Sequence, residues 1–182
     1  MKQPYIAAKK TIETILQYQR RNNLVLNGVP EAKDEDLFKI FEDFTAATGY
    51  PLTASDLDTI HRVPTRATNK PRPIVVKFIH RWKKEALMRK KPILTSSDIG
   101  LPNPNLKVIY SHHLTAFQRN LLARAFELKT QWGGTAAGAE AWQDHGRIYV
   151  KKPGDSRGTL VESVAQLIQL GLQVDPPPNI VA

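Results

Sequence analysis

Leu24-Val25-Leu26-Asn27-Gly28-Val29-Pro30 is the stretch on which the predicted fold depends, because an apolar run there ends abruptly at turn residues. Such a run predicts a β-strand. The next apolar residues, between Asp36 and Gly49, recur at helical spacing and predict a helix. The pattern then predicts four more elements: strands at residues 56–63 and 73–79, a helix at residues 81–91, and a strand at residues 106–110.

These elements follow one another in the order β-α-β-β-α-β over residues 22–112. That order is typical of the ferredoxin-like split βαβ arrangement, an α+β fold. The RNA-recognition motif (RRM) is one member of this class and binds single strands on its open sheet face. Because the fold supports many functions, topology alone does not identify one.

A smaller α/β domain is predicted at residues 113–174. The pattern indicates a helix at residues 115–129, a Gly/Ala-rich loop, and a hairpin that turns at His145. Thr159 and Glu162 have the spacing of a capping box, which predicts that the last helix begins at Thr159.

The two ends of the chain have different patterns. Residues 1–21 predict a helix with apolar residues at the a and d positions of two heptads, namely Tyr5, Ala8, Ile12 and Ile15. Two heptads fit either a short packing helix or the end of a coiled coil, which would support a weak homo-oligomer. Residues 175–182 contain three consecutive prolines and predict a disordered tail.

Positive charge is concentrated in the middle of the chain. The net charge of the 182 residues is +9, but residues 59–130 hold fifteen Lys/Arg and three Asp/Glu, a surplus of +12. Clustered positive charge favours a polyanion such as a nucleic acid, although a merely basic surface gives the same composition. Residues 31–58, with two basic and eight acidic residues, are acidic.

Several function classes lack their residue patterns. The chain has no cysteine, which excludes disulfides and thiolate metal sites, and its five histidines have no metal-ligand spacing. It has neither a phosphate-binding glycine loop nor a recognisable nucleophile. No apolar run is long enough to span a membrane, and no signal peptide is visible. We therefore expect no enzyme activity, metal, cofactor, small-molecule substrate or membrane contact, and an intracellular location: cytoplasmic, nuclear or virion-associated.

The predicted helix at residues 81–91 is the most basic element. It carries one acid and six basic residues: Arg81, Lys83, Lys84, Arg89, Lys90 and Lys91. Such density suits phosphate contacts, because each contact releases counterions. The alternative is a solvated amphipathic face with Trp82 and Ala86 turned inward.

The outer face of the predicted sheet lacks the aromatic side chains on which RRM domains stack bases. Alternation places Val25, Asn27, Val75 and Lys77 on this face. The sheet would then bind RNA through Asn27, Lys77 and nearby arginines, which are Arg62 and Arg72. Alternatively, another element covers Val25 and Val75.

The second strand of the predicted hairpin alternates in the same way. Arg147, Tyr149 and Lys151 fall on one face, and Ile148 and Val150 on the other. Cations can pair with phosphates while the ring stacks on a base. An ordinary half-exposed hairpin would show the same pattern.

Four stretches of the chain resemble, in order, the core domain of baculovirus few-polyhedra (FP) proteins and of the first-open-reading-frame proteins of LINE-type retrotransposons. The first is residues 21–31, around Leu24-Val25-Leu26-Asn27-Gly28-Val29-Pro30. The second joins Ile60-His61-Arg62-Val63 to residues 71–78. The third comprises Tyr110, Leu114-Thr115, Arg119 and residues 121–124, and the fourth runs from Asp144 to Lys151, with Arg157 after it.

The resemblance covers about residues 20–170. It implies an RRM-like domain followed by a small C-terminal domain, single-stranded nucleic-acid binding, and a coiled coil ahead of the first domain. The chain departs from the family pattern in its short coiled-coil segment, in the loop at residues 133–138, and in lacking a cysteine-containing zinc knuckle.

The sequence thus predicts a non-enzymatic protein that binds single-stranded RNA, or single-stranded DNA, in packaging or chaperoning retroelement or viral RNA. The alternative is an FP-like structural protein that acts through protein contacts in virion assembly. The residues expected to contact nucleic acid are Arg62, Arg72, Lys77, Arg81, Lys83, Lys84, Arg89, Lys90, Lys91, Arg119, Arg124, Arg147, Tyr149 and Lys151.

Overall fold

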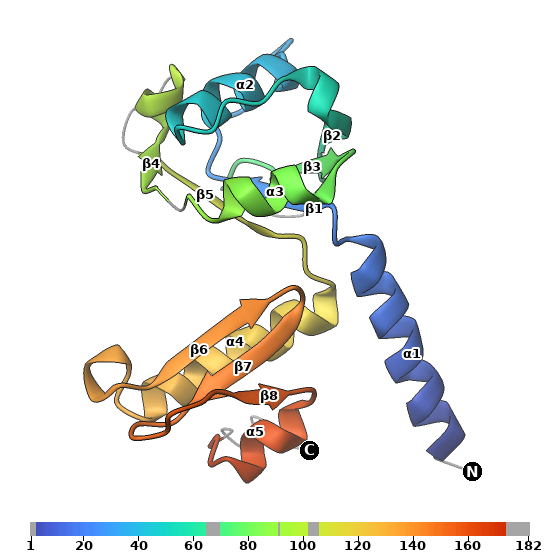
Figure 1. Ribbon diagram of the computed structural model, residues 1–182, viewed down its shortest axis with the longest axis vertical. Helices are drawn as coiled ribbons and strands as arrows, with labels where there is room; N and C mark the ends of the chain where they lie inside the picture. Colours follow the sequence, from blue (N-terminus) through green and yellow to red (C-terminus); the bar gives the residue numbers. More distant parts are fainter. Residues whose placement is uncertain (1–2, 65–69, 91, 102–105, 174–182) are drawn as a thin grey trace, which may run out of the picture. The chain divides into compact units, whose positions relative to one another are not determined.

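The computed structural model describes residues 3–64, 70–90, 92–101 and 106–173 (Figure 1). The fold is α+β, and the chain forms two compact units. The central unit is Tyr18–His113. The terminal unit combines Met1–Gln17 with Leu114–Ala182. The predicted disordered tail at residues 175–182 and the predicted phosphate contact Lys91 lie outside the described residues.

The central unit is built on a five-stranded antiparallel sheet with the strand order β2-β3-β1-β5-β4. The strands are β1 (Asn23–Asn27), β2 (Leu57–Arg62), β3 (Ile74–Phe78), β4 (Leu94–Thr95) and β5 (Lys107–His112). Four of them lie where the apolar runs predict strands. The short β4 was not predicted, because two residues are too few to show a period.

Two helices, α2 (Leu37–Ala47) and α3 (Arg81–Met88), pack their apolar residues on one face of this sheet. Helix α2 begins at Asp36, whose carboxylate accepts hydrogen bonds from the backbone amides of Phe38 and Lys39. The core combines residues from both helices and the strands: Leu24, Leu26, Ile40, Phe41, Phe44, Ile74, Val76, Phe78, Leu87 and Val108. The short helices η1 (Ala54–Asp56) and η2 (Ser96–Ile99) flank it.

The turn after β1 explains why residues 24–30 include a glycine. Gly28 has a φ of +82°, in the left-handed region that side chains disfavour. A Cβ at this position would also lie 2.0 Å from the carbonyl oxygen of Lys107 on β5. Only glycine therefore allows β1 to end this close to its neighbouring strand.

In the terminal unit, helix α4 (Ala116–Gln131) packs on one face of a three-stranded sheet. The strands are β6 (Glu140–Asp144), β7 (Arg147–Lys151) and β8 (Thr159–Val161), in that order. Leu121, Ala125 and Leu128 of α4 meet Ile148 and Val150 of β7 in its core. The short helices η3 (Thr135–Ala137) and α5 (Val164–Gln169) complete it.

The predicted capping box at Thr159 is wrong. Thr159–Val161 is a strand that pairs antiparallel with Ile148–Val150, and Val161 is buried in the core. Helix α5 begins instead after Ser163, whose hydroxyl accepts a hydrogen bond from the Gln166 amide. The spacing of Thr159 and Glu162 is a local signal for a helix start. It contains no information on the pairing of residues 159–161 with strand β7, and that pairing determines the structure here.

Helix α1 (Gln3–Gln19) contains the boundary between the two units in the sequence, so that its residues up to Gln17 belong to the terminal unit. It makes polar contacts with the rest of the terminal unit: Lys10 pairs with Glu162 at 2.8 Å, and the Gln17 side chain accepts a hydrogen bond from the Thr115 amide. Ile12 and Ile15 remain 55% and 52% exposed. Among the described residues, no helix has the length and apolar character needed to cross a membrane.

Candidate nucleic-acid interface

The side of helix α3 that faces the core differs from both interpretations of the basic helix, phosphate contact by all its cations and an amphipathic helix with Trp82 turned inward. Trp82, expected to point inward if the helix were merely amphipathic, is 61% exposed. Lys84, expected to contact phosphate, is 1% exposed and lies beside Leu87 on the buried side. Both expectations are wrong because the inward positions are three residues apart, at 84 and 87, rather than at 82 and 86.

Lys84 can be buried because it has polar partners there. Its ammonium donates a hydrogen bond to the carbonyl of Arg21, lies 3.2 Å from Nδ1 of His112, and lies 3.4 Å from the Glu85 carboxylate. Burial lowers the pKa of Lys84, although Glu85 opposes this shift. Lys84 therefore fixes α3 to the start of β1 and cannot reach a phosphate.

Four other cations of this segment are accessible to solvent. Arg81 lies 3.6 Å from the Glu85 carboxylate, and Lys83 pairs with Asp56. Arg89 and Lys90 follow at the C-terminal end; both are exposed, and neither has an ion-pair partner among the described residues. We call these four residues the α3 cation group.

Asp56 anchors one member of this group. Its carboxylate accepts a hydrogen bond from the Thr53 amide at 3.0 Å and binds the Lys83 ammonium. Burial alone would raise the pKa of Asp56, but the hydrogen bonds from Lys83 and Thr53 hold that pKa below its ordinary value. The pair ties the first turn of α3 to η1.

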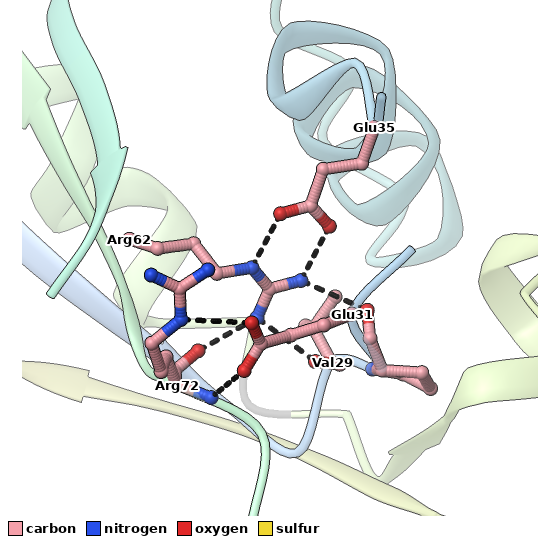
Figure 2. A network of polar contacts seen from close by, with 6 residues as sticks. Val29, Glu31, Glu35, Arg62 and Arg72 are labelled. Atoms are coloured by element: carbon pink, nitrogen blue, oxygen red, sulfur yellow. Dashed lines mark hydrogen bonds and ion pairs between the residues drawn. The ribbon is translucent and has the colours of Figure 1, made fainter. Parts of the chain in front are cut away.

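Arg62 has a structural role that the sequence did not reveal (Figure 2). Its Nε and Nη2 donate to the two oxygens of Glu35 at 2.6 and 2.7 Å. Its remaining hydrogen bonds go to the carbonyls of Val29, Pro30 and Arg72. With the side chain 4% exposed and its donors occupied, the predicted phosphate contact at Arg62 is wrong.

The neighbouring cations of the sheet are accessible but paired. Arg72 binds Glu31 through Nε at 2.8 Å and remains about half exposed, and Figure 2 shows this pair beside Arg62. Lys77 pairs with Asp58 at 2.6 Å and is likewise half exposed. Arg72 lowers the pKa of Glu31 mainly through the hydrogen bond from its backbone amide. Phosphates would have to compete with these carboxylates.

On the outer sheet face, the cross-strand register places Val75 between Val25 and His61. Val75 is buried, whereas His61 and Lys77 are exposed. The face is therefore neither uniformly covered nor a platform of aromatic rings.

The remaining predicted contacts lie in the terminal unit. Arg119 and Arg147 are exposed, without ion-pair partners among the described residues, whereas Arg124 pairs with Glu127 and Lys151 with Glu140. These four residues and Tyr149 belong to a different unit from the α3 cation group.

Tyr149 stacks on Trp142, a residue that the sequence analysis missed. The ring centroids are 5.4 Å apart and the rings are inclined by 14°. The register of the hairpin makes Trp142 and Tyr149 direct cross-strand partners, so counting back from the turn at His145 would have found the pair. Gly158 leaves room for it, because a Cβ there would lie 2.2 Å from Trp142 Cη2.

The described residues contain no group of three His, Cys, Asp or Glu side chains that could hold a metal ion. A scan against protein-family models found no match, and no curated protein matches the chain. The resemblance to few-polyhedra and LINE-type proteins therefore stays a prediction, and the function has to be argued from the surface itself.

Proposed function

We propose that the protein binds single-stranded RNA without catalysing a reaction, and that the α3 cation group provides its main phosphate contacts. The observation that carries this proposal is the placement of Arg81, Lys83, Arg89 and Lys90 on one short helix and its first residues beyond. Only two carboxylates, Asp56 and Glu85, pair with them among the described residues. The resulting charge surplus favours a polyanion, because phosphates release counterions when they bind cations.

The architecture of the central unit supports a single strand as the ligand. The antiparallel order β2-β3-β1-β5, with α2 and α3 packed on one face, is compatible with the RRM-like split βαβ arrangement that the sequence predicts. RNA-recognition motifs, one member of that class, recognise unpaired strands. Single-stranded DNA has the same phosphate chemistry and is a second ligand of this proposal.

The resemblance supplies the proposed biological role, which is packaging or chaperoning retroelement or viral RNA inside the cell. In this role the protein needs no cofactor, small-molecule substrate or membrane. A long RNA would be covered by many copies, each held by phosphate contacts that are individually weak.

A second candidate function is assembly through protein contacts, and helix α1 favours it. Ile12, Ile15 and Tyr18 follow one another at a spacing of three residues, and each is more than half exposed. A second copy of α1 could cover this apolar stripe, which would form a weak homo-oligomer. Such an oligomer is compatible with RNA binding.

Electrophoretic shifts with a labelled 20-mer distinguish these functions. At low salt we expect the full chain to bind the single strand more tightly than the matching RNA duplex. Absence of any shift would contradict RNA binding and leave assembly as the better account. Incubating the same oligonucleotide with Mg²⁺ or Mn²⁺ tests the non-enzymatic part, because we expect it to remain intact.

A further inference from the structure

Trp82 is the least expected residue on the surface of the central unit. Burying an aromatic side chain is normally among the largest favourable contributions to folding, yet Trp82 is 61% exposed. Ile79, three residues earlier, is 50% exposed. Lys84 and Leu87 occupy the buried side of the helix, so α3 cannot turn Trp82 inward without exposing them.

The surroundings of Trp82 are cationic. Arg81 precedes it and is exposed, and the Lys83 ammonium lies 5.5 Å from the centroid of the indole ring. Arg89 follows seven residues later. Because seven residues are almost two full helical turns, Trp82 and Arg89 lie on the same side of the helix, about 10 Å apart along its axis.

Two acids, Glu85 and Asp56, pair with cations of this helix. Glu85, one turn after Trp82, pairs with Arg81 and lies 3.4 Å from Lys84. Asp56 pairs with Lys83. An acidic protein partner would match the cations but would have no use for a flat, exposed ring. An unpaired nucleotide matches both features, since its base can stack on indole and its phosphate can pair with a neighbouring cation.

We propose that Trp82 is the base-stacking residue of this surface: one unpaired RNA base stacks on its indole ring, while phosphates on either side pair with Arg89 and, in competition with Glu85 and Asp56, with Arg81 and Lys83. The strand then runs along α3. This inference rests on the proposed RNA binding and adds to it a single position at which a base, rather than the backbone, is held.

The site also accounts for the missing aromatic residues of the sheet. Stacking on Trp82 would occur on the helical side of the central unit, where the cations are, instead of on the outer sheet face. Stacking accepts any base, because every base has a π face. The site therefore predicts little sequence preference, with purines favoured for their larger ring area.

The test compares two fluorescently labelled RNA 10-mers, oligo(A) and an abasic strand with the same sugar–phosphate backbone, by anisotropy. We expect the full chain to bind oligo(A) about tenfold more tightly than the abasic strand. Trp82→Ala should lose most of that difference by weakening oligo(A) alone, and Trp82→Phe should keep part of it. Ile79→Ala, which removes exposed apolar area from the same patch, is the matched control and should bind both strands normally.

Three outcomes would overturn the stacking site. They are equal binding of both strands by the full chain, unchanged oligo(A) binding by Trp82→Ala, and an equal loss on both strands, which would indicate a general effect on the surface. In each case RNA binding itself would stand. If the full chain binds neither strand at low salt, the proposed function fails instead. Thermal unfolding of each variant shows that it is folded, as expected for changes at exposed positions.

Discussion

At the scale of single residues, the same residue type has opposite roles in this protein. Arg62 and Lys84 are buried and hold the fold together, whereas Arg89 and Lys90 are exposed and unpaired among the described residues. The difference comes from distant partners: Arg62 meets Glu35, and Lys84 meets the carbonyl of Arg21. Charge alone therefore does not identify a binding residue.

Replacing Arg62 by alanine should destabilise the protein by about 3–5 kcal/mol, because it leaves the Glu35 carboxylate partly buried without its cation. Arg72→Ala is the matched control. Its ion pair with Glu31 is half exposed, so its loss should cost about 0–1 kcal/mol. Urea unfolding measures both values. Equal costs for the two variants would contradict the structural role of Arg62.

The same pair predicts how stability depends on pH. Hydrogen bonds from Arg62 hold the pKa of Glu35 below its ordinary value of 4.5. A carboxyl group whose pKa is lower in the folded state stabilises the protein above the ordinary pKa, and this contribution is lost as the pH falls through the lowered value. The free energy of unfolding should therefore fall below about pH 4.5.

Glu35→Gln is the control for this pH dependence. The variant should be less stable than the parent protein near pH 7, and its stability should fall less steeply in acid because one titrating group is gone. Chemical unfolding at several pH values between 3 and 7 measures both slopes. Identical slopes for the two proteins would show that other carboxylates determine the acid dependence.

At the scale of elements, the strands could be predicted from sequence better than the orientation of the helices. The apolar runs at Leu24–Leu26 and Ile74–Val76 lie in a sheet, with all but Val25 buried, so their composition alone indicates strands. Helix α3 is only eight residues long, and two inward faces fit its pattern equally well. Partners 63 and 28 residues away in the chain, Arg21 and His112, decide between them.

Two cations at the C-terminal end of helix α3 have no ion-pair partner among the described residues. Changing Arg89 and Lys90 together to glutamine should weaken binding to all single-stranded RNAs alike, because phosphate contacts carry no sequence information. The slope of log K against log salt should flatten by about 1.4, because each phosphate that is no longer neutralised removes about 0.7 from the slope. Lys84→Met should leave affinity and slope unchanged in the folded protein.

A double variant with the same loss of charge controls for net charge. Lys33 and Lys39 are exposed in the acidic segment of the central unit, so Lys33→Gln with Lys39→Gln removes two positive charges away from α3. That variant should keep the salt slope of the parent protein. If both double variants flatten the slope equally, binding follows total charge and not the α3 cation group.

At the scale of the whole molecule, the sequence predicted the sheet of the central unit and the hairpin of the terminal unit, but not the third strand of the second sheet or how the site residues are distributed. Fourteen residues were expected to contact nucleic acid; two of them, Arg62 and Lys84, are used inside the central unit. Arg119, Arg124, Arg147, Tyr149 and Lys151 lie in the terminal unit. A charged side chain is buried here only where it meets partners distant in the sequence. A local sequence pattern does not show such partners.

We expect helix α1 to determine whether whole molecules associate with one another. The apolar stripe of α1 is short, so we expect any oligomer to dissociate at low micromolar concentration, and Ile12→Glu with Ile15→Glu to abolish it. Sedimentation velocity at several concentrations measures the equilibrium. A tight oligomer that persists in this double variant would show that the two compact units assemble without α1.

The central claim is that cations on the surface of the central unit hold a single RNA strand through its phosphates. Anisotropy titrations of a labelled single-stranded RNA with the full chain, over a range of salt concentrations, test it most directly. If the four members of the α3 cation group each engage one phosphate, log K should fall with log salt at a slope of about −2.8. Binding that does not respond to salt, or no binding even at low salt, would contradict the account.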